Sequence, residues 1–180
     1  MNILTVILVV IGSLILILLI VATTAKNEYT IHREIIINRP VQQVFEYIKY
    51  LKNADQYNKW VMIDPNLRKD YKGTDGTVGF VYYWDSDNKQ VGKGEQEITK
   101  IKEGERVEYE IRFKKPFEGT SYASIITQPS GNNQTKVTWV FNGVRNYAMK
   151  IFHILFNLKK VLSKDLQTSL VNLKNALEKQ

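Results

Sequence analysis

Cysteine is absent from the 180-residue sequence, and proline and histidine are scarce, with four and two residues. The lack of cysteine excludes disulfides, thiolate metal sites and a cysteine nucleophile, and it leaves the redox compartment open. His32 and His153 lie in unrelated segments without an HExxH motif, so nothing predicts a zinc site. The sequence also lacks a glycine-rich phosphate loop and a G-x-S-x-G nucleophile motif. We therefore find no catalytic signature and expect no metal and no cofactor.

Charge is missing from the N-terminus. No charged side chain precedes Lys26, and residues 3–22 form a long apolar run. At about 1.5 Å of rise per helical residue, roughly 20 residues span the ~30 Å hydrocarbon core of a bilayer. We expect a single-pass transmembrane anchor over residues 1–25 and one domain of ordinary size over residues 26–180.

The alternative interpretation of this N-terminus is a cleaved signal peptide, in which Ala25 is the small residue before the cut. No Lys or Arg precedes the run, and the run is longer than the roughly 7–15 residues of a signal core. Both features favour a retained anchor. Lys26, Arg33 and Arg39 follow the run, so the positive-inside rule places the domain in the cytoplasm.

The net charge is +7, from 25 Lys and Arg against 18 Asp and Glu. A basic excess suits an anionic membrane surface or a nucleic acid. The lysines, however, are scattered through many segments, which is typical of a solvated surface. The aromatic residues alternate inward along the expected strands and leave no exposed stacking platform, so we expect no nucleic-acid partner.

The hydrophobic pattern predicts an α+β fold. Alternation predicts a strand over residues 29–38, which Pro40 ends, and helical spacing follows over 41–52 and 54–62. A period of two then recurs in six further segments: 67–71, 78–84, 91–102, 107–113, 120–128 and 135–142. Residues 147–179 return to helical spacing, with leucine every three or four residues from Leu155 to Leu177. We expect a curved antiparallel sheet of about seven strands around one long C-terminal helix.

Three local stretches resemble the SRPBCC superfamily, which has the helix-grip fold and includes START lipid-transfer domains and polyketide cyclases. Residues 35–40 (Ile-Ile-Ile-Asn-Arg-Pro) followed by 44–48 (Val-Phe-Glu-Tyr-Ile) resemble its opening strand, turn and helix. Residues 53–60 resemble its short second helix with a tryptophan, and 166–177 resemble the close of its terminal helix. These motifs are structural and imply a fold rather than a reaction.

The resemblance implies a cavity between the sheet and the long helix, in which an apolar small molecule binds. From the residues themselves, this is where the inward faces of the strands meet the terminal helix. The candidate ligand-binding residues are Phe80, Tyr82, Trp84, Tyr109, Ile111, Phe113, Tyr122, Trp139 and Phe141, with Phe152, Leu155 and Phe156 as a lid. For any one of them, ordinary core packing is the alternative.

We therefore expect a membrane-anchored binding module for a lipid or other hydrophobic small molecule. One alternative is a cyclase or aromatase-type enzyme, which would need an inward acid–base pair such as Glu95 with Tyr109 or Tyr122. Another is a protein-binding module like the chaperone cofactors of the superfamily, which would need an apolar outer sheet face. The segment 147–158 is apolar around most of its circumference, so it either plugs the cavity or dips into the membrane interface.

Overall fold

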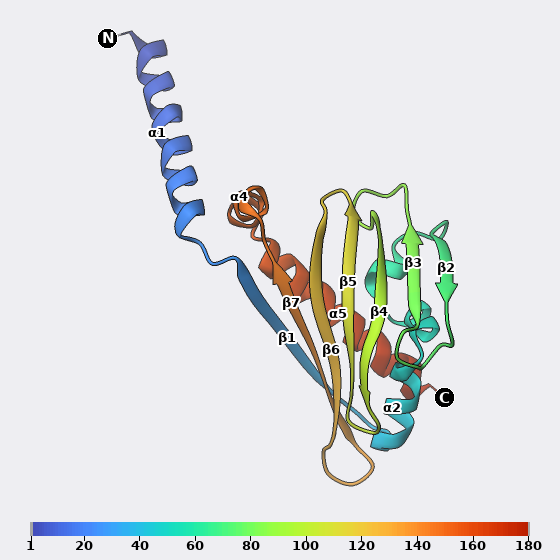
Figure 1. Ribbon diagram of the computed structural model, residues 1–180. Coiled ribbons are helices and arrows are strands. Elements are labelled where there is room, and N and C mark those ends of the chain that lie inside the picture. Colours follow the sequence, from blue (N-terminus) through green and yellow to red (C-terminus); the bar gives the residue numbers. More distant parts are fainter. Residues whose placement is uncertain (1, 180) are drawn as a thin grey trace.

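The computed structural model describes residues 2–179, without the side chain of Ala148. An N-terminal helix, α1 (Ile3–Thr24), projects from a single α+β domain (Figure 1). The domain opens with β1 (Glu28–Ile37), α2 (Val41–Lys49), the 3-10 helix η1 (Leu51–Gln56) and α3 (Lys59–Met62). Six more strands follow: β2 (Arg68–Lys72), β3 (Val81–Asp85), β4 (Lys93–Lys102), β5 (Arg106–Lys115), β6 (Gly119–Pro129) and β7 (Thr135–Val144). The chain closes with α4 (Tyr147–Phe156) and α5 (Leu158–Glu178).

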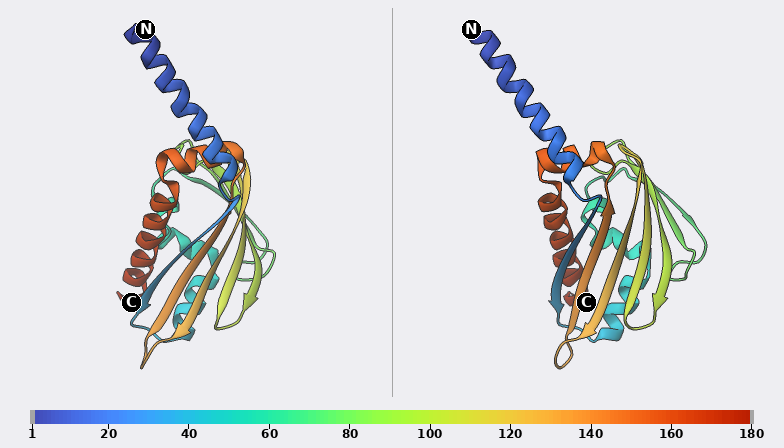
Figure 2. Two further views of the ribbon diagram at one scale, coloured as in Figure 1. Left: turned by 90° about the vertical axis from the view of Figure 1, so that its left-hand side faces the viewer. Right: turned by 60° about the vertical axis from the view of Figure 1, so that its left-hand side comes forward.

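The seven strands form one antiparallel sheet in the order β1-β7-β6-β5-β4-β3-β2. The two views of Figure 2 show the sheet curving around α5, which lies along its concave side. This arrangement confirms the predicted helix-grip fold.

The core lies between the concave face of the sheet and α5. Along β7, Val137, Trp139 and Phe141 point into the core, because successive side chains of a strand alternate between its two faces. The α5 leucines at 166, 170, 173 and 177 are at most 1% exposed, and each contributes about 2 kcal/mol of hydrophobic stabilisation. The leucine spacing of three and four residues therefore fixes which face of α5 meets the sheet.

The terminal helix is broken, and the prediction of one continuous helix over residues 147–179 is wrong. Asn157 separates α4 from α5 and has left-handed backbone angles, φ 46° and ψ 47°. Asparagine tolerates this conformation better than most residues do. The break turns α4 away from the axis of α5, so the two helices lie against different parts of the molecule (Figure 2).

Other element boundaries also differ from the sequence prediction, as two examples show. The expected helix over residues 54–62 is divided into η1 and α3 around Tyr57. The third strand begins at Val81 rather than Val78, because Gly76 and Gly79 have positive φ angles of 78° and 86° and belong to the preceding turn.

Candidate ligand-binding pocket

A cavity of about 200 Å³ lies between the concave face of the sheet, α3 and the start of α5. All three tryptophans of the chain line it. The lining residues are Asn58, Trp60, Val61, Leu67, Tyr82, Trp84, Gln90, Val91, Gln96, Ile111, Phe113, Ala123, Trp139, Phe141, Leu162 and Leu166. The volume is smaller than the roughly 300–1,000 Å³ of sites for drug-sized ligands, so the pocket as it stands suits a small molecule or part of a longer one.

The pocket lies at the end of the sheet from which α1 leaves. Trp84 and Phe113 are close to the C-terminal ends of β3 and β5, and Phe141 is close to that of β7. That end of β7 pairs with the start of β1, since Val144 is opposite Glu28. Towards the opposite end of the sheet, Ile98, Val107 and other core side chains fill the interior.

One wall of the pocket is an aromatic series on β3 and β5. The ring of Trp84 packs 6.0 Å from that of Tyr82 and 5.9 Å from that of Phe113. Its indole Nε1 donates a hydrogen bond to the Val91 carbonyl at 3.2 Å. Gly94 on the neighbouring strand makes room for the indole, because a Cβ atom there would lie 2.5 Å from the Trp84 ring. The glycine therefore allows the large ring to lie across β4.

The opposite wall is held by polar contacts between α3 and α5. The Lys59 ammonium pairs with the Asp165 carboxylate, and the Lys59 backbone N–H donates to the Ser169 hydroxyl at 3.0 Å. These contacts position the short α3, with Trp60 and Val61, against the long helix. An element of four residues has little helical stability of its own, so such tertiary contacts are what keep it in place.

The residues lining the cavity include no Lys, Arg, Asp, Glu or His. Two lining residues have buried polar atoms without a hydrogen-bond partner in the described structure, the Tyr82 hydroxyl and the Trp139 indole Nε1. Burial raises the pKa of Tyr82 well above its ordinary value, so its hydroxyl stays protonated. The pocket is thus uncharged, with a few neutral polar groups among its aromatic and aliphatic walls.

Six of the twelve sequence-predicted site residues line this pocket: Tyr82, Trp84, Ile111, Phe113, Trp139 and Phe141. Phe80 and Tyr109 are buried in the core but are not part of the lining. The Tyr109 hydroxyl donates to the Ile48 carbonyl at 3.3 Å. Whether the lining residues contact a ligand remains a prediction.

The structure places the other four predicted site residues outside the pocket. Tyr122 is 49% exposed on the outer face of β6, because Ala123 and Ile125 take the inward positions. Neighbouring residues of a strand point to opposite faces of the sheet, so an inward Ala123 requires an outward Tyr122. The prediction that Tyr122 faces the pocket is therefore wrong. Phe152, Leu155 and Phe156 are exposed on α4, which turns off the axis of α5 at Asn157, and they are not among the lining residues.

Sequence reasoning missed the residues that loops and short elements bring to the pocket. Trp60, Val61 and Leu67 come from α3 and the segment after it, and Gln90 and Val91 precede β4. These segments are so short that their hydrophobic spacing does not indicate which side chains face the pocket. Leu162 and Leu166, by contrast, belong to the leucine series of the terminal helix, and that series was a usable signal.

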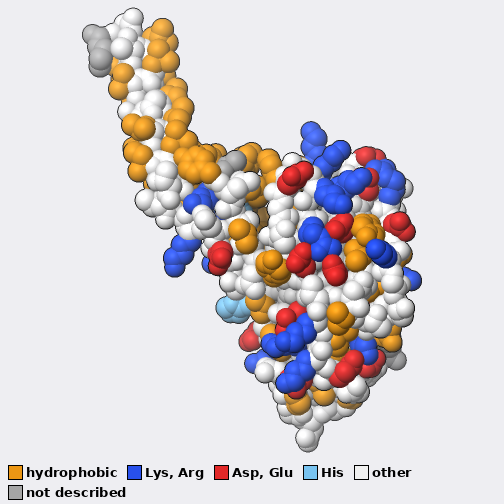
Figure 3. All heavy atoms as spheres, viewed as in Figure 1, with side chains coloured by type: hydrophobic (Ala, Val, Ile, Leu, Met, Phe, Trp, Pro, Cys, Tyr) orange, Lys and Arg blue, Asp and Glu red, His pale blue; other side chains and the backbone are white. Residues whose placement is uncertain are grey.

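Glu95 is not directed into the pocket, so the predicted acid–base pair with Tyr109 or Tyr122 does not form. On the outer face, its carboxylate accepts hydrogen bonds from Arg112 at 2.6 Å and Lys114 at 2.8 Å. The hydrogen bond from Lys114 lowers the pKa of Glu95 most, and the one from Arg112 lowers it further. Figure 3 shows this outer face as a mixture of basic and acidic side chains, which also disfavours the protein-binding alternative. Among the described residues, no three His, Asp or Glu side chains gather as a metal site.

Comparison with known proteins supports this interpretation of the fold. None of the curated proteins compared matches the sequence. Protein MLL2253 from Mesorhizobium loti has a similar structure, with a TM-score of 0.61 and 14% identity, covering 84% of this chain and 98% of its own. The Aha1 dimer from Colwellia psychrerythraea gives 0.58 and 17%, covering 83% and 96%. Norcoclaurine synthase from Thalictrum flavum, solved in complex with dopamine and hydroxybenzaldehyde, gives 0.63 and 10%, covering 85% and 88%.

At these identities the solved structures establish the fold alone. The family profile described as polyketide cyclase / dehydrase and lipid transport matches residues 28–178, which is nearly the whole domain after α1. The chain therefore belongs to the polyketide cyclase / dehydrase and lipid transport family.

Proposed function

We propose that this protein is a membrane-anchored binding module that holds a neutral hydrophobic small molecule or lipid between its sheet and α5. The uncharged, aromatic lining of the pocket carries this proposal. A charged group placed there would lose its hydration and find no counter-ion among the lining residues. A neutral apolar molecule has no such desolvation penalty, and it gains contact with the aromatic wall.

The anchor is supported by the length and composition of α1. The helix has 22 residues and a mean hydropathy of 3.4 in its most apolar window, none of which is buried against the domain. At about 1.5 Å per residue the helix is roughly 33 Å long, which matches the hydrocarbon thickness of a bilayer. The basic residues that follow α1 favour a cytoplasmic domain in this proposal.

Ligand binding is tested by tryptophan fluorescence, because all three tryptophans line the pocket. The full chain in mild detergent is titrated with a brominated fatty alcohol, since bromine quenches a tryptophan that it contacts. We expect saturable quenching. Ala123→Leu places extra side chain in the pocket and should remove the saturable part, whereas Ala176→Leu on α5 lies outside the lining and should retain it. Equal quenching of both variants would contradict binding in this pocket.

The anchor is tested separately on membranes from expressing cells. We expect the chain to resist extraction with alkaline carbonate and to keep its N-terminal residues by intact mass. A mass that begins after Ala25 would identify a cleaved signal peptide instead. Protease added to sealed vesicles of known orientation reports the side on which the domain lies, and digestion from the non-cytoplasmic side would overturn the proposed orientation.

A further inference from the structure

Helix α4 has its polarity reversed relative to an ordinary surface helix. Its two basic side chains, Lys150 and His153, are each 7% exposed. Most of its large apolar side chains are exposed, and Leu155 and Phe156 are 58% and 60% exposed. A surface helix of a water-soluble domain buries its apolar stripe and exposes its charges. Water is therefore a poor solvent for the outer face of this helix.

The inner face of α4 packs against β1. The His153 ring lies 4.7 Å from the Tyr29 ring, measured between centroids. Burial and the nearby Arg145 guanidinium lower the pKa of His153 to about 4, so the imidazole is neutral at physiological pH. The guanidinium itself lies over the Tyr29 ring, 5.0 Å from its centroid. These contacts fix which face of α4 points outward.

The exposed apolar surface extends beyond α4 to the loop between β5 and β6. The Phe117 ring, from that loop, lies 5.2 Å from the Phe152 ring, and Phe152 stacks on Phe156 at 5.6 Å. All three rings belong to exposed residues. We call the surface formed by Phe117 and the outward α4 residues Phe152, Leu155 and Phe156 the apolar ledge. Two separate elements thus contribute aromatic side chains to one outward surface.

The apolar ledge is continuous with the candidate membrane span. The Tyr147 hydroxyl at the start of α4 donates to the Leu19 carbonyl of α1 at 3.0 Å, and Ala22 of α1 is fully buried. Leu19 is five residues before the end of α1 at Thr24. Five residues correspond to about 7.5 Å of helix, which is within the ~5–10 Å depth of interfacial helices. Figure 2 shows α4 lying across the end of the domain at the foot of α1, transverse to it.

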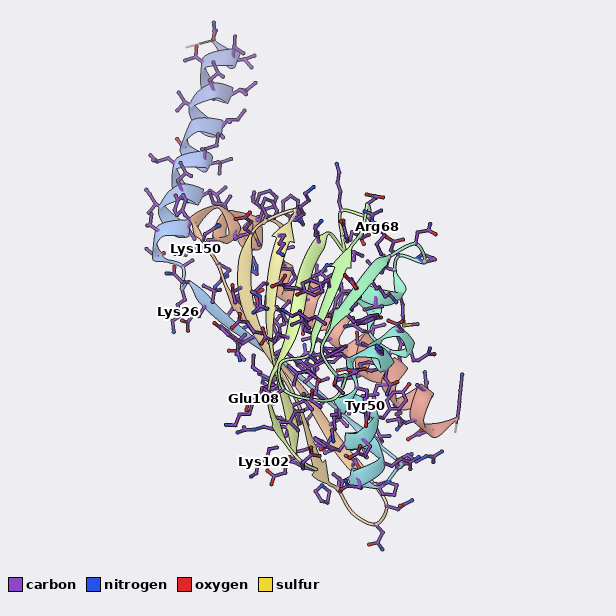
Figure 4. All side chains as sticks on the ribbon, turned by 45° about the vertical axis from the view of Figure 1, so that its right-hand side comes forward. Lys26, Tyr50, Arg68, Lys102, Glu108 and Lys150 are labelled. Atoms are coloured by element: carbon purple, nitrogen blue, oxygen red, sulfur yellow. The ribbon has the colours of Figure 1, made fainter. Side chains whose placement is uncertain are left out.

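Cations surround the same end of the molecule. Lys159 and Lys160 are exposed directly after the helix break, and Lys26 is exposed directly after α1. Figure 4 places Lys26 beside the foot of α1. Basic residues at the boundary of an apolar surface are attracted to anionic lipid headgroups. The charge pattern is therefore complementary to a phospholipid surface.

We propose that the apolar ledge inserts into the interfacial layer of the same phospholipid bilayer that α1 spans. This inference rests on the proposed membrane anchor. The bilayer supplies an apolar environment to Leu155, Phe156 and Phe117, and lipid headgroups meet Lys159 and Lys160. Insertion holds the domain flush with the membrane, and the pocket lies at the end of the sheet that faces it.

The test uses single-cysteine variants of the full chain, because the chain has no other cysteine. Leu155→Cys reports on the apolar ledge, Leu14→Cys on the middle of α1, and Val171→Cys is an exposed apolar control on α5. Each is labelled with an environment-sensitive fluorophore and reconstituted into vesicles of phosphatidylcholine and phosphatidylglycerol. Quenchers are a nitroxide on the lipid chains and iodide in the water.

We expect the lipid nitroxide to quench the labels at positions 155 and 14 severalfold more than the label at 171, with iodide showing the reverse order. A label at 155 that behaves like the one at 171, while the label at 14 is in lipid, would overturn the ledge and leave the anchor intact. Protection of the 155 label from both quenchers would assign the surface to a second protein copy and overturn the proposal. An aqueous label at 14 would refute the anchor and, with it, insertion of the ledge into a bilayer that α1 spans.

Discussion

Two buried tyrosines differ in whether their hydroxyl has a hydrogen-bond partner. The Tyr109 hydroxyl donates to the Ile48 carbonyl, whereas the Tyr82 hydroxyl has no partner in the described part of the chain. An unpaired buried polar group costs about 1–3 kcal/mol, while a typical satisfied hydrogen bond contributes about 1 kcal/mol. Removal of the two hydroxyls should therefore affect the free energy of unfolding differently.

We expect Tyr109→Phe to lower the free energy of unfolding of the ligand-free protein by about 1 kcal/mol. Tyr82→Phe should leave it unchanged or raise it by about 1 kcal/mol, because the substitution removes an unsatisfied group. Denaturant titration of both variants in the same detergent measures the difference. Equal losses in the two variants would show that the Tyr82 hydroxyl is paired. If a ligand accepts a hydrogen bond from Tyr82, Tyr82→Phe also weakens binding of that ligand.

The lowered pKa of His153 predicts a pH dependence of stability. Its ordinary value is 6.5 and its value in the folded protein is about 4. Between these values the unfolded chain binds a proton that the folded chain does not, so stability falls as the pH drops from about 6.5 to about 4. Above pH 6.5 both states are neutral at this residue, and its contribution is constant.

The thermal midpoints of the wild-type chain and His153→Gln, measured across this range, isolate the effect. We expect the difference between the two proteins to change between pH 6.5 and 4 and to be constant above it. His32→Gln is the control, because His32 is exposed on β1. A pH profile of His153→Gln that parallels the wild type would show that His153 is protonated as easily in the folded state as in the unfolded one.

At the scale of elements, the break at Asn157 decides where α4 points. Its left-handed angles cost most residues about 1–2 kcal/mol, but glycine adopts them freely. We expect Asn157→Ala to lower the free energy of unfolding by about 1 kcal/mol and Asn157→Gly to be nearly neutral. Thermal unfolding and far-ultraviolet circular dichroism measure both. A stabilised Asn157→Ala with more helical signal would mean that α4 and α5 readily merge into one helix.

The sequence predicts the elements well where one hydrophobic period continues without interruption. Residues 107–113 alternate strictly and form β5, and the leucine series of α5 faces the sheet as expected. The leucine spacing also continues across Asn157, so periodicity alone does not indicate the break. In β6, apolar residues occupy both faces, and the inward position of Ala123 rather than Tyr122 depends on the pairing with β5 and β7.

The pocket residues likewise divide into those that the hydrophobic period predicts and those that it does not. Its strand residues, such as Tyr82 and Trp139, could be predicted because alternation assigns them to the inner face. Trp60 and Val91 could not, because a four-residue helix and the short segment before β4 have too few positions to define an inward face, and tertiary contacts place their side chains. The position of Trp60, for example, depends on α3, which Lys59 fastens to Asp165 of a helix more than a hundred residues later in the chain.

For the molecule as a whole, the connection between α1 and the domain is short and held in place. Three residues separate Thr24 from Glu28. The Asn27 carbonyl accepts a hydrogen bond from the Arg145 backbone N–H at 2.7 Å, and the Lys26 carbonyl accepts one from the Arg145 guanidinium at 2.8 Å. The link between α1 and β1 is thus held against the residue that follows β7. In the proposed orientation, the end of the sheet that carries the pocket faces the bilayer.

This geometry predicts that the pocket loads from the membrane rather than from water. A flexible insert of about 20 Gly and Ser residues between Ala25 and Lys26 has an r.m.s. length of roughly 25 Å and lowers the effective concentration of the pocket at the bilayer. The apolar ledge still holds the domain, so we combine the insert with Phe152→Ser and Phe156→Ser, both exposed and outside the pocket lining. We expect each change alone to slow tryptophan quenching by brominated fatty alcohol in vesicles modestly, and both together to slow it severalfold. The affinity measured in detergent should stay the same, because neither change touches the pocket. Uptake at the wild-type rate in the combined variant would show that the ligand arrives through water and that the shared end of pocket and anchor has no role in loading.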